Sequence, residues 1–147
     1  MSREDAESLL DSGNFPENSA VISFSDPSLR RIDSDYTHVD YGCVCDKILY
    51  IELDDLDIDA LCESGLTYDT YFTEASDVAR FVLEADSRGM DIVCQCEYGQ
   101  SRSAGCAAAI AEYFYRDGIS IFSDYRYFPN KVIYHKLFDA LCAEGKR

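Results

Sequence analysis

Short apolar runs alternate with longer, more polar segments along the chain. Three of these runs predict strands at 21–24, 48–53 and 92–94, and the first is rich in β-branched residues. The run at 48–53 is expected to be buried, and the run at 92–94 is expected at the centre of a sheet. Residues 28–45 are polar and follow no clear pattern, and a short helix, an edge strand, or both are open alternatives there.

Other segments repeat apolar residues every three or four positions and predict amphipathic helices. One short helix is expected over residues 4–12, and another starts at Thr73, whose hydroxyl is expected to cap it. A third starts at Ser101 and is so rich in alanine that it is expected to be buried nearly all round. The last helix follows Pro129. This alternation favours a single α/β domain over residues 1–147, with a central, mostly parallel sheet flanked by helices.

Composition favours a globular protein, since 47% of the residues are hydrophobic. No apolar run approaches the length of about 18 residues needed to cross a membrane. The first residues are charged and lack the apolar segment of a signal peptide. Seven cysteines, an odd number, without an export signal favour reduced thiols and a cytoplasmic location.

The formal net charge of −15 at pH 7 narrows the expected partners. Nucleic acids and anionic membranes are bound largely through basic residues, so neither is expected as a partner. Polyanionic substrates are also repelled at long range. A single arginine in an anion-binding loop can still hold a phosphate group at short range.

The most distinctive chemistry lies where the third predicted strand meets the alanine-rich helix. Cys96 ends the strand, Gly99 permits a tight loop, and Arg102 and Ser103 open the helix. A strand, a tight loop and a helix N-terminus together form a site for a phosphate-sized anion. Cys96 at the floor of this loop is expected to be a thiolate. Arg102 offers a planar fork for two phosphoryl oxygens, and Ser103 a hydrogen bond to the sulfur.

The segment Cys96-Glu97-Tyr98-Gly99-Gln100-Ser101-Arg102-Ser103 resembles the signature of the cysteine-dependent protein tyrosine phosphatases. Its Gly-x-Ser-Arg-Ser portion is most similar to the dual-specificity branch. An acidic Asp54-Asp55 turn, a Phe72-Thr73-Glu74 helix start and the alanine-rich helix are similar to small bacterial tyrosine-phosphatase-like proteins. In order of elements, this resemblance covers residues 20–142.

The resemblance implies a two-step hydrolysis of phosphate monoesters without a metal ion or other cofactor. Cys96 attacks phosphorus and forms a phosphocysteine, and an aspartic acid protonates the leaving oxygen. Asp55 is the preferred acid, Asp54 the second choice, and Asp57 and Asp69 remain open. The loop residues that would bind the phosphoryl oxygens are Glu97, Tyr98, Gly99, Gln100, Ser101 and Arg102.

The implied substrate is a phosphorylated protein or a small phosphomonoester, and free phosphate or sulfate would occupy the same loop. The loop contains no lysine, unlike that of phosphatases that act on highly phosphorylated inositols. Together with the negative charge of the chain, this favours phosphotyrosine.

Two residues depart from the pattern of the resemblance and keep other interpretations open. Gln95 stands where a histidine usually precedes the cysteine, and Glu97 places an acid beside the nucleophile. Both are compatible with a catalytically weak or inactive phosphate-binding domain. The pairs Cys43-Val44-Cys45 and Cys94-Gln95-Cys96 also allow a zinc site, although their spacing is poor for chelation. A sulfur-transfer enzyme with a cysteine loop and a redox role for a second cysteine are further alternatives.

Overall fold

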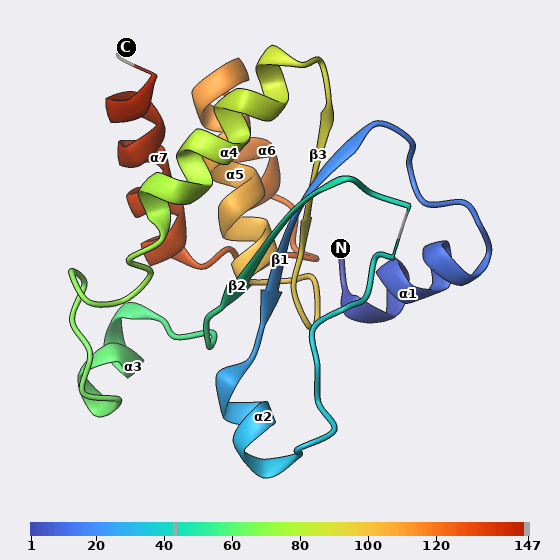
Figure 1. The fold of residues 1–147 in the computed structure, drawn as a ribbon. Helices are drawn as coiled ribbons and strands as arrows, with labels where there is room; N and C mark the ends of the chain where they lie inside the picture. The colour runs from blue at the N-terminus through green and yellow to red at the C-terminus, as the bar shows by residue number, and fades with distance from the viewer. Residues whose placement is uncertain (43, 146–147) are drawn as a thin grey trace.

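The computed structural model describes residues 1–42 and 44–145 and has an α/β fold (Figure 1). Its described strands are β1 (Ser19–Ser25), β2 (Lys47–Glu52) and β3 (Asp91–Gln95). They form one parallel sheet in the order β2-β1-β3. The α/β class and the parallel sheet flanked by helices are confirmed.

The strand order corrects two expectations. The strand that leads into the cysteine loop, β3, lies at an edge of the described sheet rather than at its centre. The central strand is β1, in which all seven residues are buried. The edge strand β2 is mostly half-exposed, and Ile51 is its one buried residue, so the expectation of a buried strand there is wrong. A hydrophobic run indicates a strand, but it does not indicate which strands lie beside it.

The expected helices over 4–12 and from 73, 101 and 130 onward are all present, with ends shifted by one or two residues. The short helices α3 and α6 were not predicted by the sequence pattern, whereas α2 lies at the start of the segment 28–45, where a short helix was one of the open alternatives. The helices that the structure describes are α1 (Arg3–Asp11), α2 (Pro27–Ile32), α3 (Ile58–Glu63), α4 (Ala75–Ser87), α5 (Arg102–Tyr115), α6 (Ile119–Phe122) and α7 (Lys131–Glu144).

The ends of two helices differ in how they are capped. Helix α4 has Glu74 at its N-cap position without a side-chain hydrogen bond, so the expectation that Thr73 caps this helix is wrong. The Thr73 hydroxyl instead donates to Glu74 Oε1 at 3.0 Å. Helix α7 is capped by Asn130, whose Oδ1 accepts a hydrogen bond from the Ile133 amide at 3.0 Å. This cap fixes the orientation of the Asn130 side chain.

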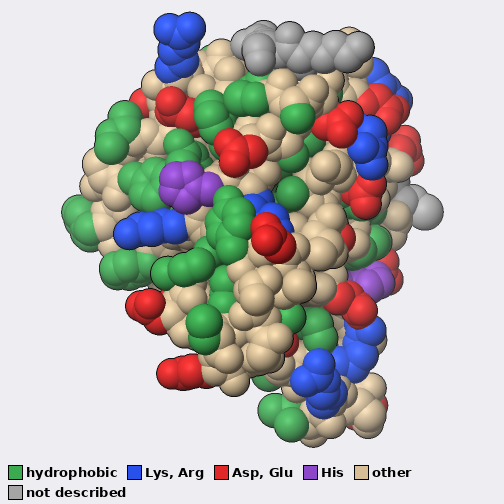
Figure 2. Space-filling model, turned by 90° about the vertical axis from the view of Figure 1, so that its left-hand side faces the viewer, with side chains coloured by type: hydrophobic (Ala, Val, Ile, Leu, Met, Phe, Trp, Pro, Cys, Tyr) green, Lys and Arg blue, Asp and Glu red, His purple; other side chains and the backbone are tan. Residues whose placement is uncertain are grey.

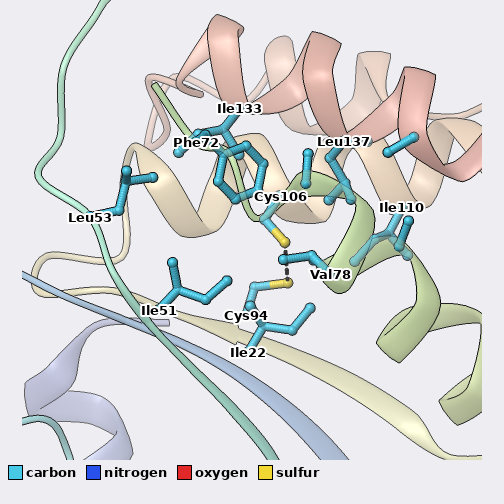
Figure 3. Packing of buried hydrophobic residues seen from close by; sticks show 14 of the residues in the cluster. Ile22, Ile51, Leu53, Phe72, Val78, Cys94, Cys106, Ile110, Ile133 and Leu137 are labelled. Atoms are coloured by element: carbon cyan, nitrogen blue, oxygen red, sulfur yellow. Dashed lines mark hydrogen bonds between the residues drawn. The ribbon is translucent and has the colours of Figure 1, made fainter. Parts of the chain in front are cut away.

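The larger hydrophobic cluster lies between the sheet and the helices α4, α5 and α7 (Figure 3). Ile22 of β1 and Cys94 of β3 enter it from the sheet, and Cys106 enters from α5. The small residues of α5 are buried nearly all round, as expected. A Cβ atom added at Gly105 would lie 2.5 Å from the Asn130 carbonyl oxygen, so the backbones of α5 and the α7 N-terminus touch here.

A smaller cluster covers the other face of the sheet and positions the N-terminal region. It contains Val21 of β1 together with Ala6 of α1, Phe15, Val39 and Tyr41. Since both faces of β1 are covered, its buried residues alternate between the two clusters. Tyr41 is 1% exposed, and its hydroxyl donates to Oε1 of Gln95 in β3 at 2.8 Å, so it lies against the strand that leads into the cysteine loop.

Figure 2 views the molecule from the side of α3 and α7. On this face Asp and Glu side chains are interspersed with Lys, Arg and hydrophobic side chains rather than gathered in one patch. Within the described part of the chain, no helix has both the length and the apolar character required to cross a membrane.

Candidate active site

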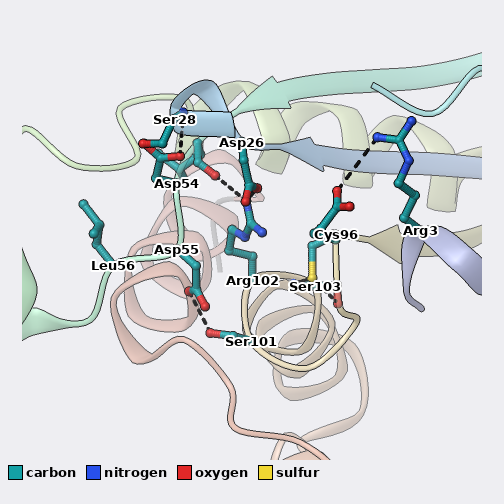
Figure 4. Close-up of polar contacts among 12 residues, drawn as sticks. Arg3, Asp26, Ser28, Asp54, Asp55, Leu56, Cys96, Ser101, Arg102 and Ser103 are labelled. Atoms are coloured by element: carbon teal, nitrogen blue, oxygen red, sulfur yellow. Dashed lines mark hydrogen bonds and ion pairs between the residues drawn. The ribbon is translucent and has the colours of Figure 1, made fainter. Parts of the chain in front are cut away.

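The loop between β3 and α5, residues 96–102, is called the phosphate loop below. Gly99 has φ +71°, a left-handed conformation that glycine adopts without strain. The Cys96 side chain is buried, with 2% of the residue exposed. Its Sγ atom lies 3.1 Å from Ser103 Oγ and 3.5 Å from the Ser103 amide nitrogen (Figure 4). The structure therefore places Ser103 within hydrogen-bond distance of the sulfur.

The backbone of the phosphate loop is held through its carbonyl groups. Gln100 O accepts a hydrogen bond from the Phe128 amide at 2.9 Å, and Ser101 O accepts one from the Asn130 amide at 3.0 Å. Within residues 1–42 and 44–145, the amides of residues 97–102 donate no hydrogen bond to another residue. A row of free amides at a helix N-terminus is the arrangement that binds a phosphate-sized anion.

Arg102 is buried, with 2% of the residue exposed, and its guanidinium is only partly satisfied. Nη1 donates to the Leu53 carbonyl at 2.7 Å and forms an ion pair with Asp26 (Figure 4). The buried Nε has no hydrogen-bond partner among the described residues. An unsatisfied buried donor costs about 1–3 kcal/mol, so a bound anion at Nε would remove a penalty that the protein otherwise carries.

The charges around Arg102 keep it protonated. Burial favours the neutral guanidinium, but the hydrogen bond and charge of Asp26 and the charge of Cys96 raise the pKa of Arg102 above its ordinary value. The phosphate loop therefore combines a positively charged guanidinium with the buried thiol group of Cys96.

Asp26 was missed by the sequence analysis. It follows β1 directly, and β1 lies beside β3 in the sheet. Because parallel strands end at the same edge of a sheet, Asp26 lies at the edge where the phosphate loop begins. The available signal was its place after a predicted strand, the same signal that singled out Asp54 and Asp55.

The four acid candidates have different surroundings. Asp55 Oδ1 accepts hydrogen bonds from Ser101 Oγ at 2.8 Å and from Asn130 Nδ2 at 3.0 Å, so it lies against the phosphate loop (Figure 4). Asp54 accepts from the Ser28 amide and hydroxyl, at 3.1 and 2.6 Å, and faces α2.

The other two candidates lie elsewhere. Asp57 caps α3 through the Ala60 amide, at 2.8 Å. Asp69 is exposed and lines a hollow with Lys136 and Asp139 that contains no residue of the phosphate loop. Of the four aspartates, Asp55 alone has a hydrogen bond to the phosphate loop among the described residues.

Gln95 orders the start of the phosphate loop. Its Nε2 donates to the Cys96 carbonyl at 2.9 Å, and its Oε1 accepts from Tyr41 at 2.8 Å and from Ser23. Burial raises the pKa of Tyr41 well above its ordinary value, so this hydroxyl remains a donor. Because two donors face Oε1, the amide group has one favourable orientation, with Nε2 on the Cys96 carbonyl.

Glu97 forms hydrogen bonds and an ion pair with residues outside the phosphate loop. Its Oε2 accepts a hydrogen bond from the Tyr36 hydroxyl at 3.0 Å and lies 3.8 Å from Arg3 Nη1. The Arg3 amide also donates to the Glu97 carbonyl at 3.0 Å. Glu97 is thus held by Arg3 and Tyr36. The neighbouring Tyr98 is 75% exposed and contributes a side chain to the rim of the site.

The zinc interpretation gains no support from the described residues. Among them, no group of three or more His, Cys, Asp or Glu side chains is placed to hold a metal ion. Cys43 lies outside the described residues. Cys45 Sγ donates to the Ser19 carbonyl at 2.9 Å, while Cys94 Sγ lies 3.5 Å from Cys106 Sγ in the core (Figure 3). Cys45 and Cys94, one from each Cys-x-Cys pair, therefore lie in different surroundings.

Neither models of known protein families nor the sequences of curated proteins match this chain. Solved structures do match its fold. A human tyrosine phosphatase-like serine/threonine/tyrosine-interacting protein matches with a TM-score of 0.59 and 14% identity, over 97% of this chain and 86% of that one. PTPMT1 in complex with PI(5)P matches with a TM-score of 0.53 and 13% identity, over 100% and 89% of the two chains. The chain therefore has the fold of the dual-specificity-like tyrosine phosphatases, as the resemblance predicted.

Proposed function

We propose that the protein hydrolyses phosphate monoesters through a phosphocysteine at Cys96, and that phosphotyrosine in proteins is its substrate class. The observation that carries this proposal is a set of hydrogen-bond donors in the phosphate loop that have no acceptor among the described residues. Among the described residues, the amides of residues 97–102 and Nε of Arg102 have no hydrogen-bond partner, and both belong to the loop whose floor is Cys96. The match in fold to dual-specificity-like tyrosine phosphatases supports the same chemistry.

In the first step, the Cys96 thiolate attacks phosphorus while the ester oxygen departs. The loop amides and Arg102 bind the phosphoryl oxygens and stabilise the negative charge of the transition state. Asp55 gives its proton to the departing oxygen, so that a phenol rather than a phenolate leaves. Asp55 is assigned this role because it lies against the phosphate loop, whereas Asp54 is bound to Ser28.

In the second step, water attacks the phosphocysteine and the sulfur becomes the leaving group. Asp55, now ionised, accepts a proton from the water. Ser103 Oγ, at 3.1 Å from Sγ, donates a hydrogen bond to the departing thiolate and stabilises its charge. The products are inorganic phosphate and the free thiolate, and no metal ion takes part in either step.

Phosphotyrosine is favoured over inositol phosphates by charge and by shape. The chain has a net charge of −15 and its phosphate loop has no lysine, so further phosphate groups on a substrate would be repelled. Tyr98 and Phe128 are 75% and 73% exposed, and both residues belong to the phosphate loop or bind its backbone. Such aromatic side chains can pack against the ring of a phosphotyrosine.

Hydrolysis of p-nitrophenyl phosphate by the wild type and by Cys96→Ser tests the proposal. The wild type is expected to turn over and the serine variant to be inactive, because a serine hydroxyl is not ionised at neutral pH. A phosphotyrosine peptide should still bind Cys96→Ser in calorimetry. Binding without wild-type turnover would instead support the phosphate-binding alternative, in which the carboxylate of Glu97 beside Cys96 disfavours the thiolate.

The acid is tested by the pH dependence of turnover in Asp55→Asn and, as the matched control, Asp54→Asn. Loss of a general acid typically lowers the rate by about 10²–10⁴-fold. Asp55→Asn is expected to show such a loss in kcat together with loss of the basic limb of the pH–rate profile. Asp54→Asn is expected to keep that limb. The reverse result would assign the role to Asp54.

A further inference from the structure

We propose that Asn130 is a positioning residue for the general acid, and that it directs the transferable proton to Oδ2 of Asp55. This inference rests on the proposed function, because it concerns the residue that holds the acid of that reaction. The amide of Asn130 and the hydroxyl of Ser101 both approach the Asp55 carboxyl group.

Both hydrogen bonds reach the same oxygen of Asp55. Asn130 Nδ2 donates to Oδ1 at 3.0 Å, and Ser101 Oγ donates to Oδ1 at 2.8 Å. A proton on Oδ1 would face two donors, whereas one on Oδ2 would leave both hydrogen bonds intact. The protonated form of Asp55 therefore carries its hydrogen on Oδ2, which is the oxygen left for the substrate.

The Asn130 amide is itself held in a single orientation. The residue is 4% exposed, and its Oδ1 caps α7 by accepting from the Ile133 amide at 3.0 Å. Its Nδ2 also donates to the Leu56 carbonyl at 2.9 Å. If the amide were reversed, its oxygen would face the Leu56 and Asp55 oxygens and the helix cap would be lost. The structure thus requires Nδ2 to point at Asp55.

The loop that carries the acid is fixed by the same neighbours. The buried Tyr71 hydroxyl donates to the Asp54 carbonyl at 2.8 Å and lies 3.4 Å from Asn130 Nδ2. Burial raises the pKa of Tyr71 to about 12, so the hydroxyl keeps its proton near neutral pH. Tyr71 and Asn130 therefore hold the backbone on both sides of Asp55.

Asn130 also binds the other half of the site through its backbone. Its amide donates to the Ser101 carbonyl at 3.0 Å, and its carbonyl oxygen lies 2.5 Å from the place that a Cβ at Gly105 would occupy. One residue thus connects the acid to the phosphate loop and fixes the separation between them.

A competing position for Asp55 explains why such a connection is needed. The charge of Asp55 contributes to the raised pKa of Arg102, and Nε of Arg102 has no hydrogen-bond partner among the described residues. An ionised Asp55 free to rotate would be drawn toward the guanidinium and would compete with the phosphoryl group. Two neutral donors on Oδ1 hold the carboxylate in place without adding a competing charge.

The test compares substrates with good and poor leaving groups in the variant Asn130→Asp. Aspartate is isosteric and is an equally good helix cap, but when ionised it replaces the donor to Asp55 with an acceptor and a like charge, whereas Asn130→Ser removes the donor without adding a charge. For phenyl phosphate, whose leaving oxygen needs a proton, the rate of phenol release in a single turnover is expected to fall about tenfold or more. For a dinitrophenyl phosphate, whose leaving group needs none, the rate of dinitrophenol release in a single turnover should change by less than about threefold. Release in a single turnover is compared because it reports the first step alone, whereas kcat also contains hydrolysis of the phosphocysteine, in which Asp55 acts as the base.

A double-mutant cycle with Asp55→Asn separates positioning from a merely structural role. If Asn130 acts through Asp55, adding Asn130→Asp to Asp55→Asn should cause no further loss of kcat on phenyl phosphate. Equal losses with both leaving groups, or additive losses in the cycle, would overturn the inference. Asn130→Ser, which keeps a capping hydroxyl, is expected to behave in the same way and serves if the aspartate variant does not fold.

The wild type in the same series distinguishes the two proposals. If wild-type turnover depends on Cys96 but the losses of kcat in Asp55→Asn and Asn130→Asp add up in the double variant, only the role of Asn130 is refuted. If the wild type shows no Cys96-dependent turnover, the proposed function fails and the positioning role fails with it.

Discussion

Asp26 forms an ion pair with Arg102 of the phosphate loop. The variant Asp26→Asn tests how much this ion pair contributes to the free energy of unfolding. The substitution keeps an oxygen that can accept from Arg102 but removes the negative charge. Losing one partner of a buried ion pair costs about 3–5 kcal/mol. Because the Asp26 side chain is 16% exposed and a hydrogen bond is retained, the expected loss is smaller, about 2 kcal/mol. For a chain of this length, that corresponds to a Tm lower by about 4–8 °C.

The same variant is expected to bind phosphate more tightly. The carboxylate of Asp26 lies on the guanidinium that would hold the anion, so it repels a bound phosphate. At an effective dielectric constant of about 20, like charges separated by a guanidinium group repel by about 2 kcal/mol, which salt reduces. The inhibition constant of inorganic phosphate should therefore fall by about thirtyfold at low ionic strength.

The assays are thermal unfolding and competitive inhibition of p-nitrophenyl phosphate hydrolysis by phosphate. Asp124→Asn is the matched control, because Asp124 pairs with Arg126 at the surface and should change neither quantity appreciably. Unchanged Tm and unchanged phosphate inhibition in Asp26→Asn would refute the reasoning, as would weaker phosphate binding in a variant whose fold is intact.

Three further substitutions test the packing and hydrogen bonds around the site. Gly105→Ala would place a Cβ 2.5 Å from the Asn130 carbonyl oxygen, so it should destabilise the protein by about 1–3 kcal/mol in urea unfolding. Gly99→Ala would place a Cβ 2.5 Å from the Ser2 amide nitrogen, in a backbone conformation with φ +71° that side chains other than glycine rarely adopt. The value of kcat/KM for p-nitrophenyl phosphate should fall markedly, and an unchanged kcat/KM would contradict the tight loop. Tyr41→Phe removes one donor to Gln95 Oε1, so the free energy of unfolding should fall by about 1 kcal/mol and kcat should also fall. Tyr115 is exposed, and Tyr115→Phe should change neither quantity.

The phosphate loop could be predicted because its chemistry is local. A strand, a cysteine, Gly99, Arg102 and a small-residue helix follow one another directly along the chain, and each has a stated physical role. The helices with a sustained apolar repeat were predicted for the same reason. Short helices such as α3 and α6 contain too few residues to show a repeat, and so they were missed.

The partners of the loop could not be predicted because they depend on strand order and on packing. Asp26 lies 76 positions before Arg102 and meets it only because β1 pairs with β3. Asn130 was seen only as part of a helix start, and its contact with Asp55 spans 75 positions. Gln95 was recognised as a departure from the pattern, but its contact with Tyr41 needed the fold of residues 28–45, which have no clear sequence pattern.

The central claim is that phosphate is transferred to the sulfur of Cys96. The most direct measurement is mass spectrometry of protein quenched in acid during turnover of p-nitrophenyl phosphate, followed by digestion. We expect the mass of one phosphoryl group on the peptide that contains Cys96. Asp55→Asn serves as a comparison, because loss of the base in the second step is expected to prolong the intermediate. Turnover without label on this peptide, or turnover that survives Cys96→Ser, would contradict the account.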